Sequence, residues 1–586
     1  MSKKTLCTFV SHSIAAIALC AAAVLPMAAQ AATWTGGADG YIDVPGNWSG
    51  DVTATEMLFT SDAYLRLNAD YSVFRVFGTS GNNRYITIDL SGHSLGTTAT
   101  ASSNRDFWHA SNATICITNS SDTSATFTQT SNIMLDNPNF PGTTLVIAGD
   151  KTTMNGTFFS RGGPRFSFNV LDGATLSGAK IGIGSNFSTN TVANGATLSA
   201  ATYLNIGAGS ELKPHGGDTG AWHDNLLTVS DATISGGSLL VGHGQLSNTG
   251  APYNNTIVAE DGATVSFTSV IVGCGAAATN NSICATGSGT ALSATTMRVG
   301  TRVGAADGTL YATLPATNNM VIVENGATVS VKTTNIGAGG NALVVRPGAT
   351  FEGTSGGTVQ LLSDMTDAMI TTAGGAIGSR IEVVGGTLHY NNDMRIGTQN
   401  ATNHVYGHEV FVGTGGTLSE KTMFFYGVGD RLVVSNGTVN VSGIYMGASG
   451  GNHNMVRIMG ESASFKAGSV NWDGKYAILE FAPPETPWTV APFRVTDNFT
   501  IPADVTLRLD ETALKACRNR MKAQGVSRVT MPLMQAKTNG GTIKAITISD
   551  STALSANLPE GCSLSYADGV LSLTANAGKG LTIFVR

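Results

Sequence analysis

The chain has 586 residues, of which 72 are glycine, 42% are hydrophobic and only 12% are charged. This balance argues against a disordered chain, which combines low hydrophobicity with high charge, and the length favours several domains or one repeat array. The formal charge is −6 and the longest basic run is Lys3-Lys4, which argues against a nucleic-acid groove, because such a groove needs clustered basic residues.

Residues 1–31 are typical of an export signal. Lys3-Lys4 forms a positive start, residues 14–24 are apolar, and Ala29-Gln30-Ala31 has the small-x-small pattern of a cleavage site. We therefore expect a mature chain that begins at Ala32 and is secreted, held at the cell surface or periplasmic. No later segment approaches the roughly 20 apolar residues of a membrane span, so no transmembrane span is expected in the mature chain.

Residues 32–165 are predicted to form an N-terminal cap and the first, irregular coils of a solenoid. The region opens with the aromatic segments 34–37 and 45–48 and continues with irregular strands such as 85–90. A stack of coils ends in open sheet edges, and natural proteins cover such edges. We therefore expect a cap at each end of the repeats.

A degenerate repeat centred on Asn/Asp-Gly-Ala-Thr-aliphatic-Ser occupies residues 166–477. Apolar residues alternate within each copy, as at Val270 and Val272, which indicates strands with one buried face rather than helices. A unit of about 22 residues fits one coil of short strands. The sequence therefore predicts an all-β fold, a single long β-solenoid (parallel β-helix). Its clearest copies lie at 172–177, 194–199, 261–266 and 325–330.

Each part of the repeat has a physical role. The Asn/Asp-Gly pair supplies a turn with positive φ, and the next aliphatic residue points inward. About ten coils stacked about 4.8 Å apart would make a rod on the order of 50 Å long. Asn recurs before several turns and either forms a hydrogen-bonded ladder along the stack or serves as a turn residue. These residues are Asn190, Asn255, Asn319 and Asn454.

Residues 478–586 are predicted to form a C-terminal cap. The proline-rich segment 483–487 is expected to break the ladder, because proline donates no backbone hydrogen bond. One helix is predicted, with Asp510 as N-cap and Gly525 as its stop. Its buried face would comprise Leu514, Cys517 and Met521, and the final strands would comprise 541–546, 569–573 and 581–585.

The mature chain contains an odd number of cysteines and no Cys-x-x-Cys motif. Pairing of Cys274 with Cys284, and of Cys517 with Cys562, stays open on sequence grounds. The favoured interpretation is that the thiols act as small buried hydrophobic groups. The five cysteines are Cys116, Cys274, Cys284, Cys517 and Cys562.

The aromatic opening around Trp34 and Trp48, followed by Gly-Ala-Thr-aliphatic-Ser coils, resembles exported β-helix proteins of the autotransporter-passenger-like kind. The resemblance implies a secreted or surface β-helix. Autotransporters resemble one another in a C-terminal membrane barrel, whereas residues 478–586 carry a helix and a proline-rich break. This departure argues against self-translocation.

The most polar insertion, 215–224, is the best candidate for a ligand site. Trp222 offers a ring that can stack on a sugar, and Asp218, His223 and Asp224 offer polar contacts, so these four are candidate glycan contacts. The alternative is a solvated surface loop. Trp48 and Trp108 are further candidate stacking platforms.

Two further polar segments do not match a known site. Residues 427–433 resemble half of a calcium-binding repeat, but the motif occurs once, and calcium coils need it in tandem. His404, His408 and Glu409 fall on a strand and turn rather than on the helix that a two-His site needs. The sequence therefore predicts no catalytic residue, no metal site and no cofactor.

The functional expectation is an exported or cell-surface structural, adhesin-like protein, because the repeat carries turn and core residues and no recurring reactive group. Its expected partners are surface glycans or other cell-surface proteins, and not nucleic acid. The alternatives are a glycan-binding protein and a solenoid-type polysaccharide lyase or hydrolase, which would place charged residues side by side on one outer sheet.

Overall fold

The structure is a computed structural model that describes part of the chain. Residues 1–30 of the predicted signal peptide, Trp108, Asp218, Trp222 and His404 lie outside the described residues, as do 541–545 and 581–585 of the predicted final strands. The described residues are 31–36, 39–79, 83–98, 112–134, 142–161, 166–184, 186–207, 223–242, 252–274, 277–301, 315–365, 367–398, 405–447, 452–472, 476–536, 546–548 and 558–577.

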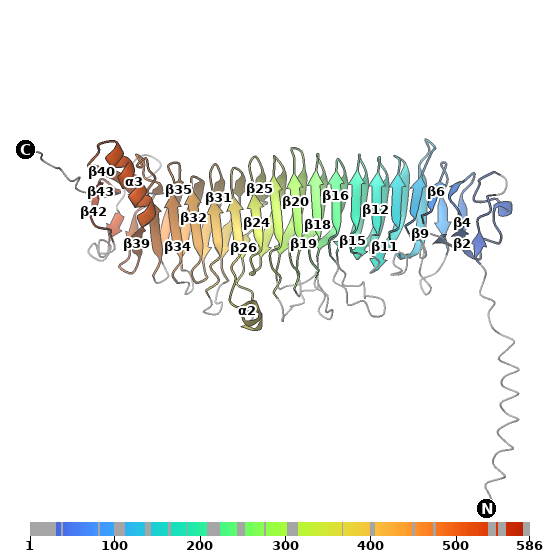
Figure 1. Ribbon diagram of the computed structural model, residues 1–586, viewed down its shortest axis with the longest axis horizontal. Coiled ribbons are helices and arrows are strands. Elements are labelled where there is room, and N and C mark those ends of the chain that lie inside the picture. Colours follow the sequence, from blue (N-terminus) through green and yellow to red (C-terminus); the bar gives the residue numbers. More distant parts are fainter. Residues whose placement is uncertain are drawn as a thin grey trace, which may run out of the picture.

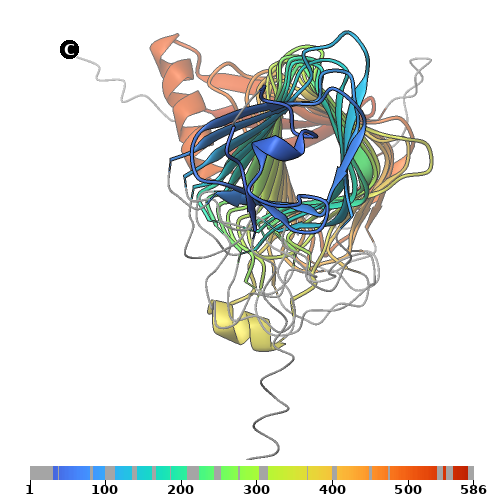
Figure 2. The same cartoon turned by 90° about the vertical axis from the view of Figure 1, so that its right-hand side faces the viewer.

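The chain winds into one long β-solenoid, which confirms the predicted fold class (Figure 1). Viewed along the rod, successive coils overlie one another (Figure 2). Sheet 1 is a parallel ladder that runs the length of the rod, with each strand paired to those of the neighbouring coils. Its strands are β3 (Ala63–Arg66), β6 (Tyr85–Asp89), β8 (Thr114–Thr118), β10 (Thr144–Ala148), β12 (Ser167–Leu171), β14 (Thr189–Ala193), β16 (Leu226–Ser230), β18 (Thr256–Glu260), β20 (Ser282–Thr286), β22 (Met320–Glu324), β24 (Ala342–Val345), β27 (Arg380–Val383), β30 (Glu409–Val412), β32 (Arg431–Ser435), β34 (Met455–Met459), β36 (Ile478–Ala482) and β39 (Thr506–Leu509).

Sheet 2 is formed by the second strand or strands of each coil and is also parallel through the repeats. Its strands are β4 (Tyr71–Val73), β7 (Leu95–Thr97), β9 (Ala125–Met134), β11 (Thr152–Arg161), β13 (Thr175–Gly184), β15 (Thr197–Ile206), β17 (Thr233–Val241), β19 (Thr264–Val272), β21 (Ala291–Val299), β23 (Thr328–Ile336), β25 (Thr350–Gly353), β26 (Val359–Leu361), β28 (Thr387–His389), β29 (Asp393–Ile396), β31 (Thr417–Phe425), β33 (Thr438–Met446), β35 (Ser464–Trp472), β37 (Phe493–Val495), β40 (Arg528–Ala536), β42 (Cys562–Ala567) and β43 (Val570–Asn576).

The repeat motif performs the roles assigned to it. In the first clear copy Asp172 and Gly173 have φ of 54° and 78°, so both residues of the turn are left-handed, as a tight turn into the next strand requires. The aliphatic residue after Thr points inward, and its equivalents stack in register from coil to coil. These stacked residues are Leu176, Leu198, Ile234, Val265, Leu292 and Val329, all at most 1% exposed.

A buried polar column runs along the rod at the position just before each strand of sheet 1, and its central part is an asparagine ladder. The side-chain amide of each Asn donates to the side-chain oxygen of the next, at 2.8 Å between Asn225 and Asn255 and 3.0 Å between Asn319 and Asn341. The ladder was one of the two alternatives left open by the sequence, and it is confirmed for Asn255 and Asn319. Asn190 lies inside β14 and donates to Ser188 and to the carbonyl of Leu226, and Asn454 accepts from the backbone N–H of Asp430, so among the described residues neither forms an amide-to-amide bond. The polar column comprises Ser188, Asn225, Asn255, Asn281, Asn319, Asn341, Ser379, His408, Asp430 and Asn454.

Glycines that directly follow strands of sheet 2, here called closing glycines, pack against this column. A Cβ at Gly273 would lie 1.9 Å from Oδ1 of Asn319, and Gly273 has φ of 60°. Gly207, Gly242 and Gly300 approach other ladder asparagines in the same way. The recurrent Asn and the recurrent closing Gly are therefore two parts of one packing contact.

The solenoid runs past residue 477 into the segment expected to form the C-terminal cap, and its first coils lie within 32–165, where irregular coils were expected. Its ladder begins at Ala63, within the segment 32–165, and continues through the pairing of β36 with β39. The proline-rich segment 483–487 therefore does not break the ladder, because it lies in the loop after β36 and not in a paired strand. With 17 strands in sheet 1 among the described residues, the rod is about 80 Å long, not about 50 Å.

Both ends carry other structure. At the N-terminal end β1 (Ala32–Thr33), β2 (Glu56–Phe59) and β5 (Arg75–Thr79) form a small sheet beside the buried Trp34 and Trp48. At the C-terminal end β40, β42 and β43 pair antiparallel, and β38 (Phe499–Ile501) pairs with β41 (Ile546–Ile548).

The predicted C-terminal helix is confirmed as α3 (Glu511–Ala523). The carboxylate of Asp510 accepts from the N–H of Ala513 at 2.8 Å, and Gly525 follows with φ of 72°. Its buried residues are Leu514, Cys517 and Met521, as predicted. A second short helix, α2 (Asp367–Ala373), was not predicted from the sequence. No described helix is both long and apolar enough to cross a membrane.

The five cysteines among the described residues are free thiols, so neither pairing that the sequence left open is formed. Cys274 and Cys517 are buried, which agrees with their interpretation as small hydrophobic groups. Cys116, Cys284 and Cys562 are half-buried.

Candidate functional site: an arginine-lined groove

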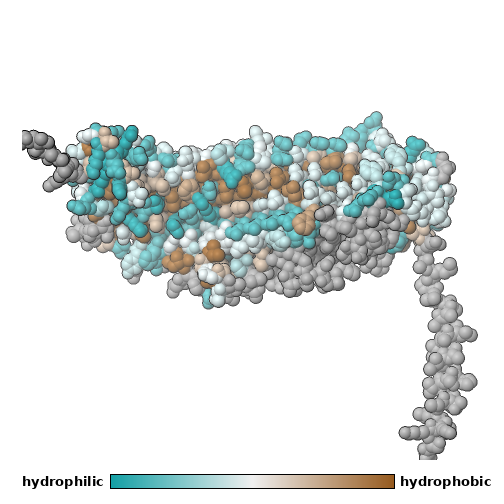
Figure 3. All heavy atoms as spheres, in the orientation of Figure 1, coloured by the Kyte–Doolittle hydropathy of each residue, from teal (hydrophilic) through white to brown (hydrophobic). Residues whose placement is uncertain are grey.

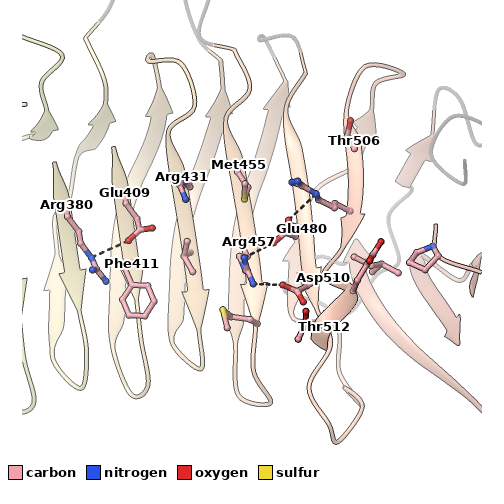
Figure 4. Close-up of a pocket in the computed structure, with 16 residues that line it drawn as sticks. Arg380, Glu409, Phe411, Arg431, Met455, Arg457, Glu480, Thr506, Asp510 and Thr512 are labelled. Atoms are coloured by element: carbon pink, nitrogen blue, oxygen red, sulfur yellow. Dashed lines mark hydrogen bonds and ion pairs between the residues drawn. The ribbon is translucent and has the colours of Figure 1, made fainter. Parts of the chain in front are cut away.

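A groove lies on the outer surface of sheet 1 near the C-terminal end of the rod, between β27 and the start of α3 (Figure 4). It encloses about 830 Å³, a volume typical of ligand sites. Its lining residues come from six neighbouring strands, the first turn of α3 and Pro559: Arg380, Glu409, Phe411, Arg431, Val433, Met455, Arg457, Met459, Glu480, Thr506, Arg508, Leu509, Asp510, Glu511, Thr512 and Pro559.

The alternation of each strand places these side chains outside the core. In β32 Leu432 and Val434 point inward and are fully buried, so Arg431 and Val433 point outward. Parallel pairing then stacks outward residues of successive coils: Glu409 pairs in register with Arg431, and Phe411 with Val433. The groove is therefore a direct consequence of the coil register.

Most charged groups of the groove bind one another. Arg457 contacts Asp510 at 2.7 Å and Glu480 at 3.0 Å, and Arg508 contacts Glu480 at 3.4 Å (Figure 4). Because the Glu480 side chain is only 8% exposed, these arginines balance a charge that is largely removed from water. The network also ties the N-terminus of α3 to the last coils.

Arg380 is held in a similar way at the other end of the groove. Its guanidinium contacts Glu409 at 3.3 Å and Glu382 at 3.4 Å, and it lies 4.9 Å from the ring centre of Phe411. Arg431, which lies between the two networks, is exposed and its side chain makes no ion pair or hydrogen bond within the described part of the chain. The groove thus presents one arginine that has no carboxylate partner.

Apolar side chains form the floor beside Arg431. Phe411, Val433, Met455 and Met459 line the groove, and Val433 is 8% exposed. The space-filling view shows hydrophobic residues along the middle of the rod, set among hydrophilic ones (Figure 3).

The loop predicted as a ligand site is described only in part. His223 and Asp224 are described, and Nδ1 of His223 lies 2.6 Å from Oδ2 of Asp224. The imidazole stacks on Tyr253 at 4.5 Å and meets the edge of Phe187 at 4.8 Å. His223 is therefore held by the ring stack and its neighbouring carboxylate, whereas Asp218 and Trp222 lie outside the described residues.

Trp48 does not offer a stacking platform. It is 7% exposed, its indole N–H donates to the carbonyl of Ile42 at 2.8 Å, and its ring packs against Trp34 and Phe59. The aromatic opening of the chain therefore belongs to the N-terminal cap.

The two polar segments that the sequence analysis set aside contribute to the polar column. Nδ1 of His408 accepts a hydrogen bond from the backbone N–H of Ser379, and the backbone N–H of His408 donates to Oδ1 of Asp430, both at 3.0 Å. Burial lowers the pKa of His408 to about 3 and raises the pKa of Asp430 to about 7. Within the described residues no group of three or more His, Cys, Asp or Glu is arranged to hold a metal ion.

The groove was not identified from the sequence. Its arginines and carboxylates are separated by whole coils, so they come together only once the register is known. The available signal was the charge at outward positions of otherwise apolar strands, as in β27, β34, β36 and β39.

Comparisons with protein-family models, curated proteins and solved structures found no match for this chain.

Proposed function

We propose that this chain is an exported, surface-associated rod with a structural, adhesin-like role and no catalytic activity, similar to the autotransporter-passenger-like β-helix proteins. Its export is supported by the positive start, apolar segment and small-x-small site within residues 1–31. Its role as a rod is supported by the stack of coils, which holds the two ends of the molecule about 80 Å apart.

The observation that carries the non-catalytic role is the mutual pairing of charges in the groove. A solenoid lyase or hydrolase needs a carboxylate or base that is free to exchange a proton with substrate. Here Glu409 and Glu480 each bind an arginine, and Asp510 both binds Arg457 and caps α3. Burial raises the pKa values of Glu420 and Asp430 and lowers that of His408, so each favours its neutral form. All three side chains are buried, Glu420 in β31 of sheet 2 and the other two in the polar column.

The proposal is tested in two arms. Proteinase K added to intact producing cells should degrade the chain, which shows surface exposure, while a cytoplasmic marker survives. The purified chain, incubated with a panel of neutral and acidic polysaccharides, should release neither reducing ends nor unsaturated products. Protection from the protease in intact cells contradicts the surface location, and turnover of any polysaccharide contradicts the non-catalytic role.

A further inference from the structure

Arg431 is distinguished from the other three arginines of the groove by its lack of a carboxylate partner. Arg380, Arg457 and Arg508 each contact at least one carboxylate within 3.4 Å. Arg431 also points outward from sheet 1 and lies next to Glu409 in register, but the Glu409 carboxylate is bound to Arg380. A guanidinium carries five N–H donors in a planar fork that matches a carboxylate, so Arg431 is available for an anion from outside the chain.

The neighbourhood of Arg431 limits the charge of that anion. The lining contains four arginines and four acidic residues, Glu409, Glu480, Asp510 and Glu511. A polyanion such as a nucleic acid would be repelled by these carboxylates, because it needs uninterrupted positive charge. A ligand with one carboxylate at the position of Arg431, and neutral groups elsewhere, meets no such repulsion.

The rest of the groove suits a hydroxyl-rich ring. Carboxylates accept hydrogen bonds from hydroxyl groups, and Thr506 and Thr512 add a donor and acceptor each at the rim. The floor of Phe411, Val433 and Met455 can pack against the C–H face of a sugar. A peptide strand fits less well, because the groove lies on the face of sheet 1, where the backbone groups already pair between coils.

We propose that the groove binds an acidic saccharide, and that Arg431 pairs with its carboxylate group. The saccharide ring lies on the floor between the two ion-pair networks, and its hydroxyl groups bind the rim. This inference names a ligand class for the adhesin-like role and rests on it. Neither network needs to open, because Arg431 is already exposed.

The test is a glycan array that carries uronic-acid and sialic-acid saccharides together with their neutral counterparts, probed with the purified full chain. Binding should be confined to carboxylated glycans. The strongest of these is then titrated by calorimetry against the free acid and its methyl ester, which keeps the ring but removes the charge. We expect at least a tenfold lower affinity for the ester, and weaker binding of the acid at high salt.

Two matched variants locate the site. Arg431→Gln should lower the affinity for the acid at least tenfold and leave the ester unchanged, whereas Arg528→Gln, at another exposed arginine of β40, should change neither. Both variants should have the melting temperature of the parent, because both arginines are exposed and Arg431 has no partner to lose. The absence of binding to every carboxylated glycan, or equal binding by Arg431→Gln, overturns the inference. Either result leaves the rod and its surface exposure standing, since the protease arm tests those separately.

Discussion

The side-chain amide of Asn281 donates a hydrogen bond to Oδ1 of Asn319 at 3.0 Å, although the two residues are 38 positions apart in the chain. The backbone N–H of Asn281 donates to the same oxygen, also at 3.0 Å. One side chain thus satisfies two buried donors of the coil before it. The separation of successive ladder residues is only 22 positions between Asn319 and Asn341, yet both hydrogen bonds are formed there as well.

Asn319→Ala should therefore destabilise the two coils that it joins. The N–H of Asn281 would lose its acceptor in a buried site, and an unsatisfied buried donor costs about 1–3 kcal/mol. We expect a loss of about 2–4 kcal/mol in the local free energy of opening, measured by native-state hydrogen exchange of amides in β20 and β22, because a repeat array need not unfold in two states. Asn391→Ala, at an exposed asparagine, should change the local free energy of opening by less than about 0.5 kcal/mol. Equal effects of the two changes would show that the ladder adds no stability.

Gly273→Ala should lower the melting temperature more than Gly262→Ala does. Both glycines have positive φ, of 60° and 83°, so alanine is strained at either by about 1–2 kcal/mol. Only at Gly273 would the new Cβ meet Asn319, at 1.9 Å, whereas nothing lies within 4 Å of a Cβ at Gly262. The difference between the two melting temperatures measures the steric contact between glycine and ladder. Identical melting temperatures would argue that the ladder moves aside without cost.

The pH dependence of stability should reveal the two titratable members of the polar column. The pKa of Asp430 is raised from 3.8 to about 7, so between these values the folded chain holds a proton that the unfolded chain has lost. Its contribution therefore falls as the pH rises from about 4 to about 7. The pKa of His408 is lowered from 6.5 to about 3, so its contribution falls as the pH drops from about 6.5 to about 3.

Asp430→Asn removes the first of these two effects. The variant should match the parent near pH 4 and exceed it by on the order of 2–4 kcal/mol at pH 8, as judged by hydrogen exchange in β30 and β32. An asparagine also keeps the acceptor for the N–H of His408. A stability difference that is constant from pH 4 to pH 8 would mean that Asp430 is ionised in the folded protein.

Native-state alkylation should divide the cysteines into two classes. Cys274 is fully buried with a pKa raised to about 11 by burial, and Cys517 lies on the buried face of α3, so both should react only after unfolding. Cys116, Cys284 and Cys562 are half-buried and should be modified first. The measurement is mass spectrometry of the tryptic peptides after a brief treatment with iodoacetamide at pH 8.5. Modification of Cys274 together with Cys284 would contradict the packing of the second sheet.

The turns, the inward aliphatic residues and the helix α3 were predictable because their signals are local. Asp172-Gly173 demands a tight turn, and Asp510 with Gly525 marks the two ends of a helix. The members of the polar column between Asn341 and Asn454 were not predictable, since Ser379 and His408 share no motif with asparagine and only the register aligns them.

The groove was hidden for the same reason. Glu409 and Arg431 are neighbours only because their strands pair, and loops of varying length between coils obscure that pairing in the sequence. The loop that contains Trp222 is distinguished in the sequence by its local polarity, and a solvated turn has the same polarity as a ligand site. A short sequence repeat therefore predicts the core of a solenoid better than it predicts the outer surface.

The central claim, that successive coils lie in register over one another, is tested most directly around Cys284. This thiol points outward and pairs in register with Val258 of the preceding coil and Ile322 of the following coil. In-register Cα atoms of neighbouring strands lie within the range that a disulfide spans. Under mild oxidation, Val258→Cys and Ile322→Cys should each form an intramolecular disulfide with Cys284, whereas Ile257→Cys, whose side chain points into the core, should not. Cross-linking of Cys284 to the new thiol in Ile257→Cys, or to neither of the in-register thiols, would contradict the stacked coils.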